Sequence, residues 1–137
     1  MAQFDEFNRA NEQYAASFDK GDLPVPPARN VAVVTCMDAR LHPEKLLGLE
    51  VGDAQVIRNA GGRVSEDAIH SLVISERLLG TEEIVVIHHT DCWMLIFGNE
   101  YLTAKIKEDL AVDTVGRDFL LFSDLEQSVR DDVETLL

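Results

Sequence analysis

The sequence contains little cysteine, has no long apolar run and begins without a leader-like segment. Its two cysteines, Cys36 and Cys92, are far apart and form no C-x-x-C motif, so a thioredoxin-like redox site is not expected. No apolar run approaches the roughly 20 residues that cross a bilayer, which predicts no membrane span. The acidic, amphipathic N-terminus lacks the basic start and apolar stretch of a signal peptide, and we therefore expect a cytoplasmic protein.

Positive charge is also scarce. The 137 residues include 12 Lys and Arg against 25 Asp and Glu, a net charge of −13. This charge repels phosphate backbones, so we expect no nucleic-acid partner. The acidic residues are spread along the chain, as is typical of a solvated surface. With 46% apolar residues, residues 1–137 can bury a core and are expected to form a single domain.

Residues 1–28 predict a helical arm followed by a connector. Residues at steps of three and four mark one face of a helix: Phe4, Phe7, Asn11, Tyr14 and Phe18. This face needs a cover, which its own domain or a second subunit could provide. Three prolines, Pro24, Pro26 and Pro27, then favour an extended connector.

Three β-branched runs, at 30–36, 54–62 and 82–89, predict strands. The first and third lack alternation, which indicates strands buried on both faces, and the second ends in a glycine-rich loop. Helical patterns follow the second and third runs. This alternation predicts an α/β fold with a mainly parallel sheet and helices on both of its faces.

The helices between and after these strands have recognisable ends. Ser65 is expected to cap a helix that Gly80 terminates. Its expected buried face comprises Ala68, Ile69, Leu72, Val73 and Leu79. A second pattern, Leu95, Tyr101, Leu102, Ile106 and Leu110, also suggests helix. Ser123 and Glu126 form a capping box for a last helix that carries Leu125, Val129, Val133 and Leu136.

Cys36, His89 and Cys92 are the candidate metal ligands. Cys36 ends the first predicted strand, and the other two lie just past the third. Ligand sites of such sheets form at the carboxyl ends of strands, and the common strand order 2-1-3 would make these three side chains converge. Two thiolates and an imidazole suit Zn²⁺ and leave a fourth position open. The alternative is that both cysteines are inert core thiols.

Asp38 and Arg40 follow Cys36 closely enough to face the same pocket. A carboxylate beside zinc can accept a hydrogen bond from the activated water or ligate the metal, and a guanidinium can hold that carboxylate in one geometry. The alternative is a surface ion pair. The other histidines have simpler explanations: His42 as a proton shuttle or a loop residue, His70 as a structural residue, and His88 as a packed, hydrogen-bonded residue.

Three motifs in this order resemble the β-class carbonic anhydrases: CMDAR at 36–40, RNAGG at 58–62 and HTDC at 89–92. The resemblance extends over most of residues 25–110. It implies that Cys36, His89 and Cys92 bind Zn²⁺ and that Asp38 and Arg40 form the catalytic dyad. It also implies a homodimer or higher oligomer in which the arm packs on a partner subunit.

The activity implied by this resemblance is reversible hydration of CO2 to bicarbonate and a proton. Zinc lowers the pKa of its water from 15.7 to roughly 7. Asp38 would orient the nucleophile, and Arg40 would keep Asp38 off the metal. In a closed state of this family, the residue matching Asp38 takes the fourth metal position instead.

Two features depart from the family. Trp93 follows the second cysteine where the family has glycine, and the sequence ends at Leu137 where relatives continue into another strand. Trp93 could narrow the pocket, rotate the HTDC turn, or lie in the core or an interface. A narrowed pocket would favour hydrolysis of COS or CS2 on the same site. A third hypothesis is a catalytically silent zinc-binding scaffold, and a missing edge strand would leave a sheet edge for a partner to cover.

Overall fold

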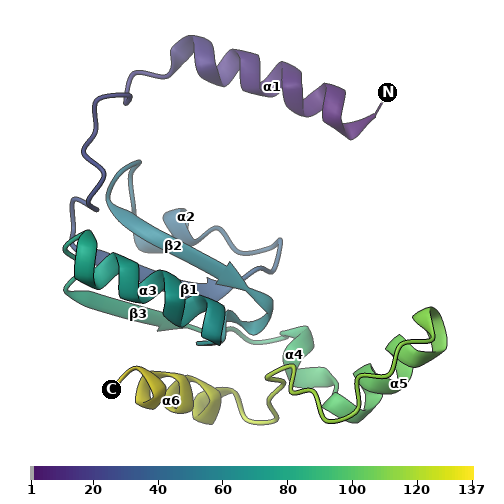
Figure 1. Ribbon diagram of the computed structural model, residues 1–137. Helices are drawn as coiled ribbons and strands as arrows, with labels where there is room; N and C mark the ends of the chain where they lie inside the picture. Colours follow the sequence, from purple (N-terminus) through teal and green to yellow (C-terminus); the bar gives the residue numbers. More distant parts are fainter. Residues whose placement is uncertain (1) are drawn as a thin grey trace.

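The computed structural model describes residues 2–137, which form an α/β fold around a parallel sheet (Figure 1). Its strands are β1 Val31–Cys36, β2 Ala54–Asn59 and β3 Glu83–Ile87, in the order β2-β1-β3. Val31 pairs with Ala54 on one side and with Glu83 on the other. The predicted fold class and the 2-1-3 order are confirmed. The carboxyl ends of all three strands therefore lie at one edge.

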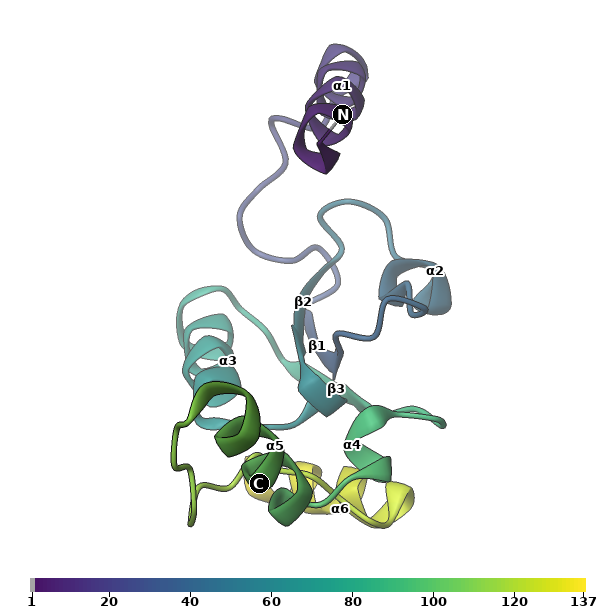
Figure 2. The same ribbon diagram turned by 90° about the vertical axis from the view of Figure 1, so that its right-hand side faces the viewer.

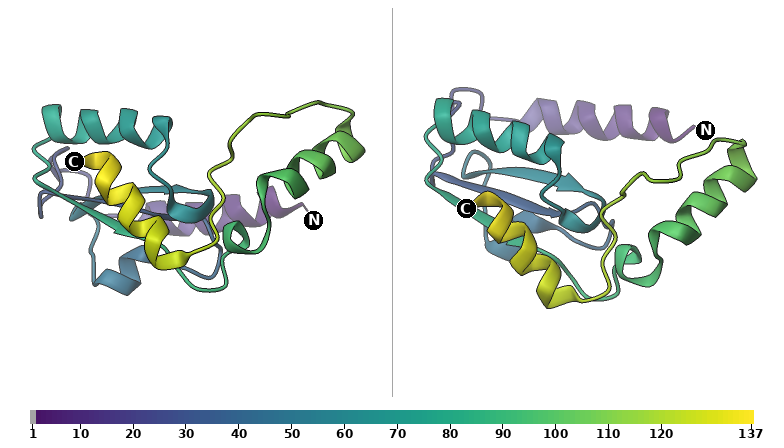
Figure 3. Two further views of the ribbon diagram at one scale, coloured as in Figure 1. Left: turned by 90° about the horizontal axis from the view of Figure 1, so that it is seen from below. Right: turned by 60° about the horizontal axis from the view of Figure 1, so that its bottom comes forward.

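The helices are α1 Gln3–Ser17, α2 Pro43–Leu47, α3 Glu66–Leu78, α4 Trp93–Ile96, α5 Asn99–Leu110 and α6 Leu125–Leu136, with a 3₁₀ turn at Ala60–Gly62. Helices α3 and α2 lie on opposite faces of the sheet (Figure 2). Helix α6 runs beside β3 (Figure 3). None of the described helices is both long and apolar enough to span a bilayer.

The core forms around the central strand β1. Its residues Ala32 and Val34 are fully buried against Leu72 of α3, and the cluster extends to Ile84 of β3 and Leu136 of α6. This β-branched strand, flanked by strands on both sides, is buried from Ala32 to Cys36, as predicted, and only Val31 at its start is half-buried. The prediction that the third strand is fully buried is wrong, because β3 is an edge strand of half-buried residues.

Helix α3 begins as predicted but packs differently. The Ser65 hydroxyl accepts a hydrogen bond from the Ala68 N–H at 3.3 Å, and Gly80 adopts a left-handed conformation just after the helix. Val73, expected in the core, is 52% exposed. Ser75 is buried instead, and its hydroxyl has a partner because it lies 2.5 Å from that of Thr81.

The C-terminal half confirms the predicted helices and corrects their details. The pattern at 95–110 is helical, as predicted, and it is divided between α4, which ends at Ile96, and α5, which starts after Gly98. The last helix is capped by Asp124, whose carboxylate accepts a hydrogen bond from Gln127 N–H at 3.1 Å, and not by Ser123. The buried residues of α6 are also polar, Ser128 and Asp132.

The N-terminal arm does not pack on its own domain. Helix α1 stands apart from the sheet at the end of an extended connector (Figure 1). It has no buried residue, and Phe4, Phe7 and Tyr14 are 68%, 63% and 57% exposed. Cover by a second subunit therefore stays as the prediction for this aromatic face.

Candidate metal centre

The three candidate ligands converge at the carboxyl edge of the sheet. Cys36 is the last residue of β1, His89 lies in the loop after β3, and Cys92 immediately precedes α4. Their ligand atoms all lie within 4.8 Å of one another, and the two sulfur atoms are 3.9 Å apart. Both cysteines are buried. The strand order thus brings together residues that are 56 positions apart in the sequence.

The orientation of the His89 ring is compatible with metal binding. Its Nδ1–H donates to the carbonyl oxygen of Thr90 at 2.8 Å, so the neutral ring carries its lone pair on Nε2. Nε2 is buried and has no hydrogen-bond partner among the described residues. A hydrogen bond from the second ring nitrogen to a carbonyl is also the usual support of a ligating histidine. A cation between Nε2 and the thiols would satisfy this buried atom.

The thiols are suited to a soft cation. Burial raises the pKa of the Cys92 thiol, and the adjacent Cys36 thiol raises it further. Without a cation the Cys92 sulfur therefore favours the protonated form. A metal ion stabilises thiolates and releases their protons, so metal binding would reverse this preference. Two sulfur donors and one imidazole nitrogen fit Zn²⁺ chemically.

Asp38 and Arg40 form a pair beside these ligands. The Arg40 Nε–H and Nη2–H donate to Asp38 Oδ1 and Oδ2 at 2.9 and 2.7 Å, and the Arg40 backbone N–H donates to Oδ1 at 2.8 Å. These hydrogen bonds hold the pKa of Asp38 well below its usual range and raise that of Arg40. Asp38 Oδ2 lies 3.9 Å from His89 Nε2. Asp38 is thus ionised and paired with Arg40.

Two further residues hold this dyad, and sequence reasoning assigned neither a role. Asp91 accepts from Arg40 Nη1–H at 2.9 Å through its carboxylate, and its carbonyl accepts from Nη2–H at 3.0 Å. Arg58 donates to the carbonyl oxygens of Cys36 and Asp38 at 2.9 and 2.8 Å. Both residues lie inside the HTDC and RNAGG motifs, but the motifs give no indication of these partners.

The glycine loop after β2 closes the floor of the site. Gly62 has φ +67, and a Cβ there would lie 2.8 Å from the Ile87 carbonyl oxygen and 2.9 Å from the Cys36 nitrogen. A side chain has no room, because the loop packs directly on the ends of β1 and β3. Glycine at 62 therefore permits the close approach that joins two ligand-bearing strands.

Trp93 lies at the mouth of the site. Its side chain is 66% exposed and stacks on Phe97, with ring centroids 5.1 Å apart, so it is not a core residue of this chain. It lines a cavity of about 100 Å³ with Cys36, Asp38 and Cys92. It also borders an outer hollow beside Arg40. The indole therefore borders both the cavity beside the thiols and the outer hollow.

The remaining histidines do not join the ligands. His42 and His70 are exposed. The His88 side chain is fully buried, and its ring nitrogens lie 2.7 Å from Ser128 Oγ and 3.0 Å from Gly62 O. Burial lowers the pKa of His88, and the nearby Arg63 adds to this effect. The prediction of a packed, hydrogen-bonded His88 agrees with this environment.

Proteins of known name are similar to this chain in both sequence and fold. The sequence model of the carbonic anhydrase family matches residues 31–111. Beta-carbonic anhydrase 1 of Mycobacterium tuberculosis is 47% identical over 112 residues, which cover 82% of this chain and 68% of that protein. The chain belongs to the β-carbonic anhydrase family. This membership confirms the predicted family and an enzyme of the carbonic anhydrase class.

Two further proteins similar to this chain are informative. The crystal structure of carbonic anhydrase from Streptococcus mutans matches with a TM-score of 0.95 and 54% identity, over 99% of this chain and 82% of that one. Carbon disulfide hydrolase of Saccharolobus solfataricus is 40% identical over 128 residues, 93% of this chain and 61% of that protein. The β-carbonic anhydrase fold thus carries two named activities among similar proteins.

Proposed function

We propose that this chain catalyses the zinc-dependent, reversible hydration of carbon dioxide to bicarbonate and a proton. The observation that carries the proposal is the unpartnered, buried Nε2 of His89, which converges with the Cys36 and Cys92 sulfurs within 4.8 Å. Cys36, His89 and Cys92 are the proposed ligands. A bound zinc ion would act as a Lewis acid that makes hydroxide available near neutral pH.

Asp38 is the proposed positioning group for the nucleophile. Its Oδ1 already accepts two hydrogen bonds from Arg40, whereas Oδ2 accepts one. A carboxylate oxygen has two acceptor sites, so Oδ2 retains a free one on the oxygen nearest His89 Nε2. This site can accept a hydrogen bond from an attacking water or hydroxide. The pairing with Arg40, itself braced by Asp91, keeps Asp38 from turning toward the ligands.

The pocket favours a small, uncharged substrate. The cavity beside the two thiols is lined mainly by apolar atoms of Met37, Ala60, Gly61, Trp93 and Met94. A linear molecule such as CO2 fits a cavity of about 100 Å³ without needing polar partners. Bicarbonate, the charged product, is expected to leave past Arg40 into the outer hollow.

A second candidate activity is hydrolysis of COS or CS2 on the same site. Trp93 at the cavity mouth favours it, because an indole narrows the entrance and adds polarisable surface. The similarity to a protein named carbon disulfide hydrolase adds support. A third candidate is a catalytically silent zinc scaffold, for which the exposed aromatic stack of Trp93, Phe97 and Tyr101 would serve packing.

We also propose that the chain acts as a homodimer or higher oligomer. The aromatic face of α1 is exposed within one chain, and burial against a second copy would remove it from water. Residues 1–137 would act as one domain with CO2 and bicarbonate as small-molecule partners. The cytoplasmic location stays a prediction.

Rapid-mixing assays on zinc-loaded protein with CO2, COS and CS2 test the proposal. CO2 hydration is the expected result, and COS or CS2 turnover without hydration would replace it with the second candidate. Full zinc content with no turnover would favour the scaffold. Trp93→Gly is expected to raise CO2 hydration if the indole restricts entry, and Tyr101→Ala, in the same stack but farther from the cavity, is the control.

A further inference from the structure

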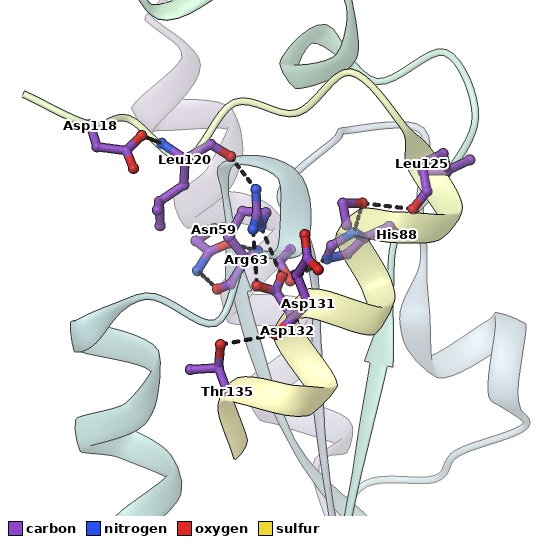
Figure 4. Close-up of polar contacts among 11 residues, drawn as sticks. Asn59, Arg63, His88, Asp118, Leu120, Leu125, Asp131, Asp132 and Thr135 are labelled. Atoms are coloured by element: carbon purple, nitrogen blue, oxygen red, sulfur yellow. Dashed lines mark hydrogen bonds and ion pairs between the residues drawn. The ribbon is translucent and has the colours of Figure 1, made fainter. Parts of the chain in front are cut away.

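A buried polar cluster lies directly behind the metal ligands. Arg63 Nε–H and Nη2–H donate to Asp132 Oδ2 and Oδ1 at 2.9 and 3.1 Å, across 69 positions of sequence. His88 Nε2 lies 3.1 Å from Asp132 Oδ2. Figure 4 shows these three side chains together between α6 and the loop after β2. We call Arg63, His88 and Asp132 the rear cluster.

The rear cluster joins three separate segments. His88 follows β3, Asp132 belongs to α6, and Arg63 follows the glycine loop after β2. Arg63 also donates to the Leu120 carbonyl oxygen at 2.5 Å, and its guanidinium lies over the Phe122 ring at 5.3 Å. The same Phe122 ring stacks on His88 at 5.4 Å between centroids. The guanidinium of Arg63 and the carboxylate of Asp132 therefore have all their polar contacts inside the fold.

These contacts act on the segments that carry the ligands. His88 and His89 are consecutive, and their side chains point to opposite sides of the chain, His88 to the rear cluster and His89 to the cysteines. Fixing the His88 ring therefore fixes the backbone from which His89 extends. His88 also bonds to Gly62 O, and Gly62 packs on the backbone of Cys36. Contacts of His88 and Gly62 thus hold the backbone next to two of the three proposed ligands, His89 and Cys36.

Stability alone gives a weak reason for this arrangement. The Arg63 and Asp132 side chains are only 12% and 5% exposed, and desolvating such a pair can cost as much as the attraction returns. An apolar contact between α6 and the sheet would serve packing as well. Asp132 instead stands on the buried face of α6, where a helix packed on a sheet ordinarily carries apolar residues.

We propose that the rear cluster is a positioning device that holds His89 in its metal-binding geometry, with Arg63, His88 and Asp132 as positioning residues. The inference rests on the proposed zinc site. Its consequence is that weakening the cluster changes metal affinity and ligand geometry even where the fold survives. Partners behind a ligand typically change metal affinity by about 10- to 100-fold.

The test compares Asp132→Asn with Asp131→Asn, an exposed neighbour on α6 that bonds to Gln127 and not to Arg63. Near-UV circular dichroism first establishes that each variant is folded. We expect Asp132→Asn to weaken zinc binding about 10-fold in chelator competition and to shift the absorption bands of the Co²⁺-substituted protein. Asp131→Asn should match the wild type in both.

A second variant separates positioning from stability. Arg63→Met/Asp132→Leu replaces the buried pair with apolar side chains. This double variant is expected to fold with near wild-type thermal stability but to bind zinc more weakly than the wild type, as Asp132→Asn does. Folded variants with wild-type zinc affinity and Co²⁺ spectrum would overturn the inference. Wild-type protein that binds no zinc would instead refute the proposed function, so the two failures are distinguishable.

Discussion

Two arginine–aspartate pairs flank the consecutive histidines after β3, one on each side. Arg40–Asp38, the front pair, lies on the His89 side, with side chains 59% and 12% exposed. Arg63–Asp132, the rear pair, lies on the His88 side, with side chains 12% and 5% exposed. Both pairs are bidentate, with contacts of 2.7 to 3.1 Å. They differ in what surrounds them and not in their own geometry.

This difference in surroundings suits the front pair to contact a substrate and the rear pair to hold the structure in place. The front pair leaves one acceptor site of Asp38 free and lines the ligand cavity through Asp38. In the rear pair, Asp132 also contacts His88, and Arg63 also binds the Leu120 carbonyl oxygen. A charge with a free acceptor beside a cavity can act on a substrate, whereas one with every partner inside the fold can act only through its neighbours.

The largest expected effect comes from removing His89, the proposed ligand that lies beside Asp38 and follows His88 directly in the sequence. His89→Ala removes the imidazole nitrogen, and two thiols alone leave the site one ligand short. We expect loss of stoichiometric zinc and of all measurable turnover. Metal analysis and the hydration assay check this result, with His70→Ala on α3 as a histidine control. Full zinc retention in His89→Ala would contradict the ligand assignment.

The next largest effect, on the rate of hydration, should distinguish Asp38 from Asp91, the two aspartates that contact Arg40. Asp38→Ala is expected to keep zinc and lower kcat/KM for hydration about 100-fold, because the nucleophile loses its positioning acceptor. Asp91→Ala removes the other carboxylate that contacts Arg40. The Asp91 side chain is 75% exposed, so this change should have a much smaller effect. Equal losses in the two variants would mean that Arg40, and not Asp38, carries the role.

The front pair could be predicted from sequence, and the rear pair could not. Asp38 and Arg40 are two positions apart and follow a strand end, so strand order and chain direction suffice to place them beside Cys36. Arg63 and Asp132 are 69 positions apart. Their meeting depends on how α6 docks beside β3, which helical periodicity does not determine.

The errors on the C-terminal half have the same origin. The capping pattern indicated Ser123, one residue before the actual cap Asp124, and the apolar stripe of α6 gave no indication that Ser128 and Asp132 would be buried. Periodicity identifies a helix reliably, but tertiary partners decide which polar residues are buried. The exposure of Trp93, which is 66%, likewise could not be read from the sequence, because an indole beside a ligand is equally compatible with a core position.

Removing one member of the rear pair should destabilise the fold, although the intact pair adds little net stability. Asp132→Ala leaves the Arg63 guanidinium buried without its carboxylate and should lower the free energy of unfolding by about 3–5 kcal/mol. Asp131→Ala, on the exposed side of the same helix, should change it by less than about 0.5 kcal/mol. Urea denaturation of the two variants measures the difference. Similar small losses would indicate that solvent reaches the rear pair.

The smallest effect concerns pH and His88. Burial holds the pKa of His88 below its ordinary value of about 6.5, so the folded chain binds fewer protons than the unfolded chain as pH falls through that value. Stability from neutral His88 is therefore full above about pH 6.5 and declines on acidification. Asp132 and Arg63 face the ring and act in opposite directions on its pKa.

The melting temperature should fall between about pH 7.5 and about pH 5.5, and His88→Gln should flatten this fall because glutamine does not titrate. An unchanged pH profile in His88→Gln would mean that the rear histidine is free to take up a proton in the folded state, so that its burial does not affect stability.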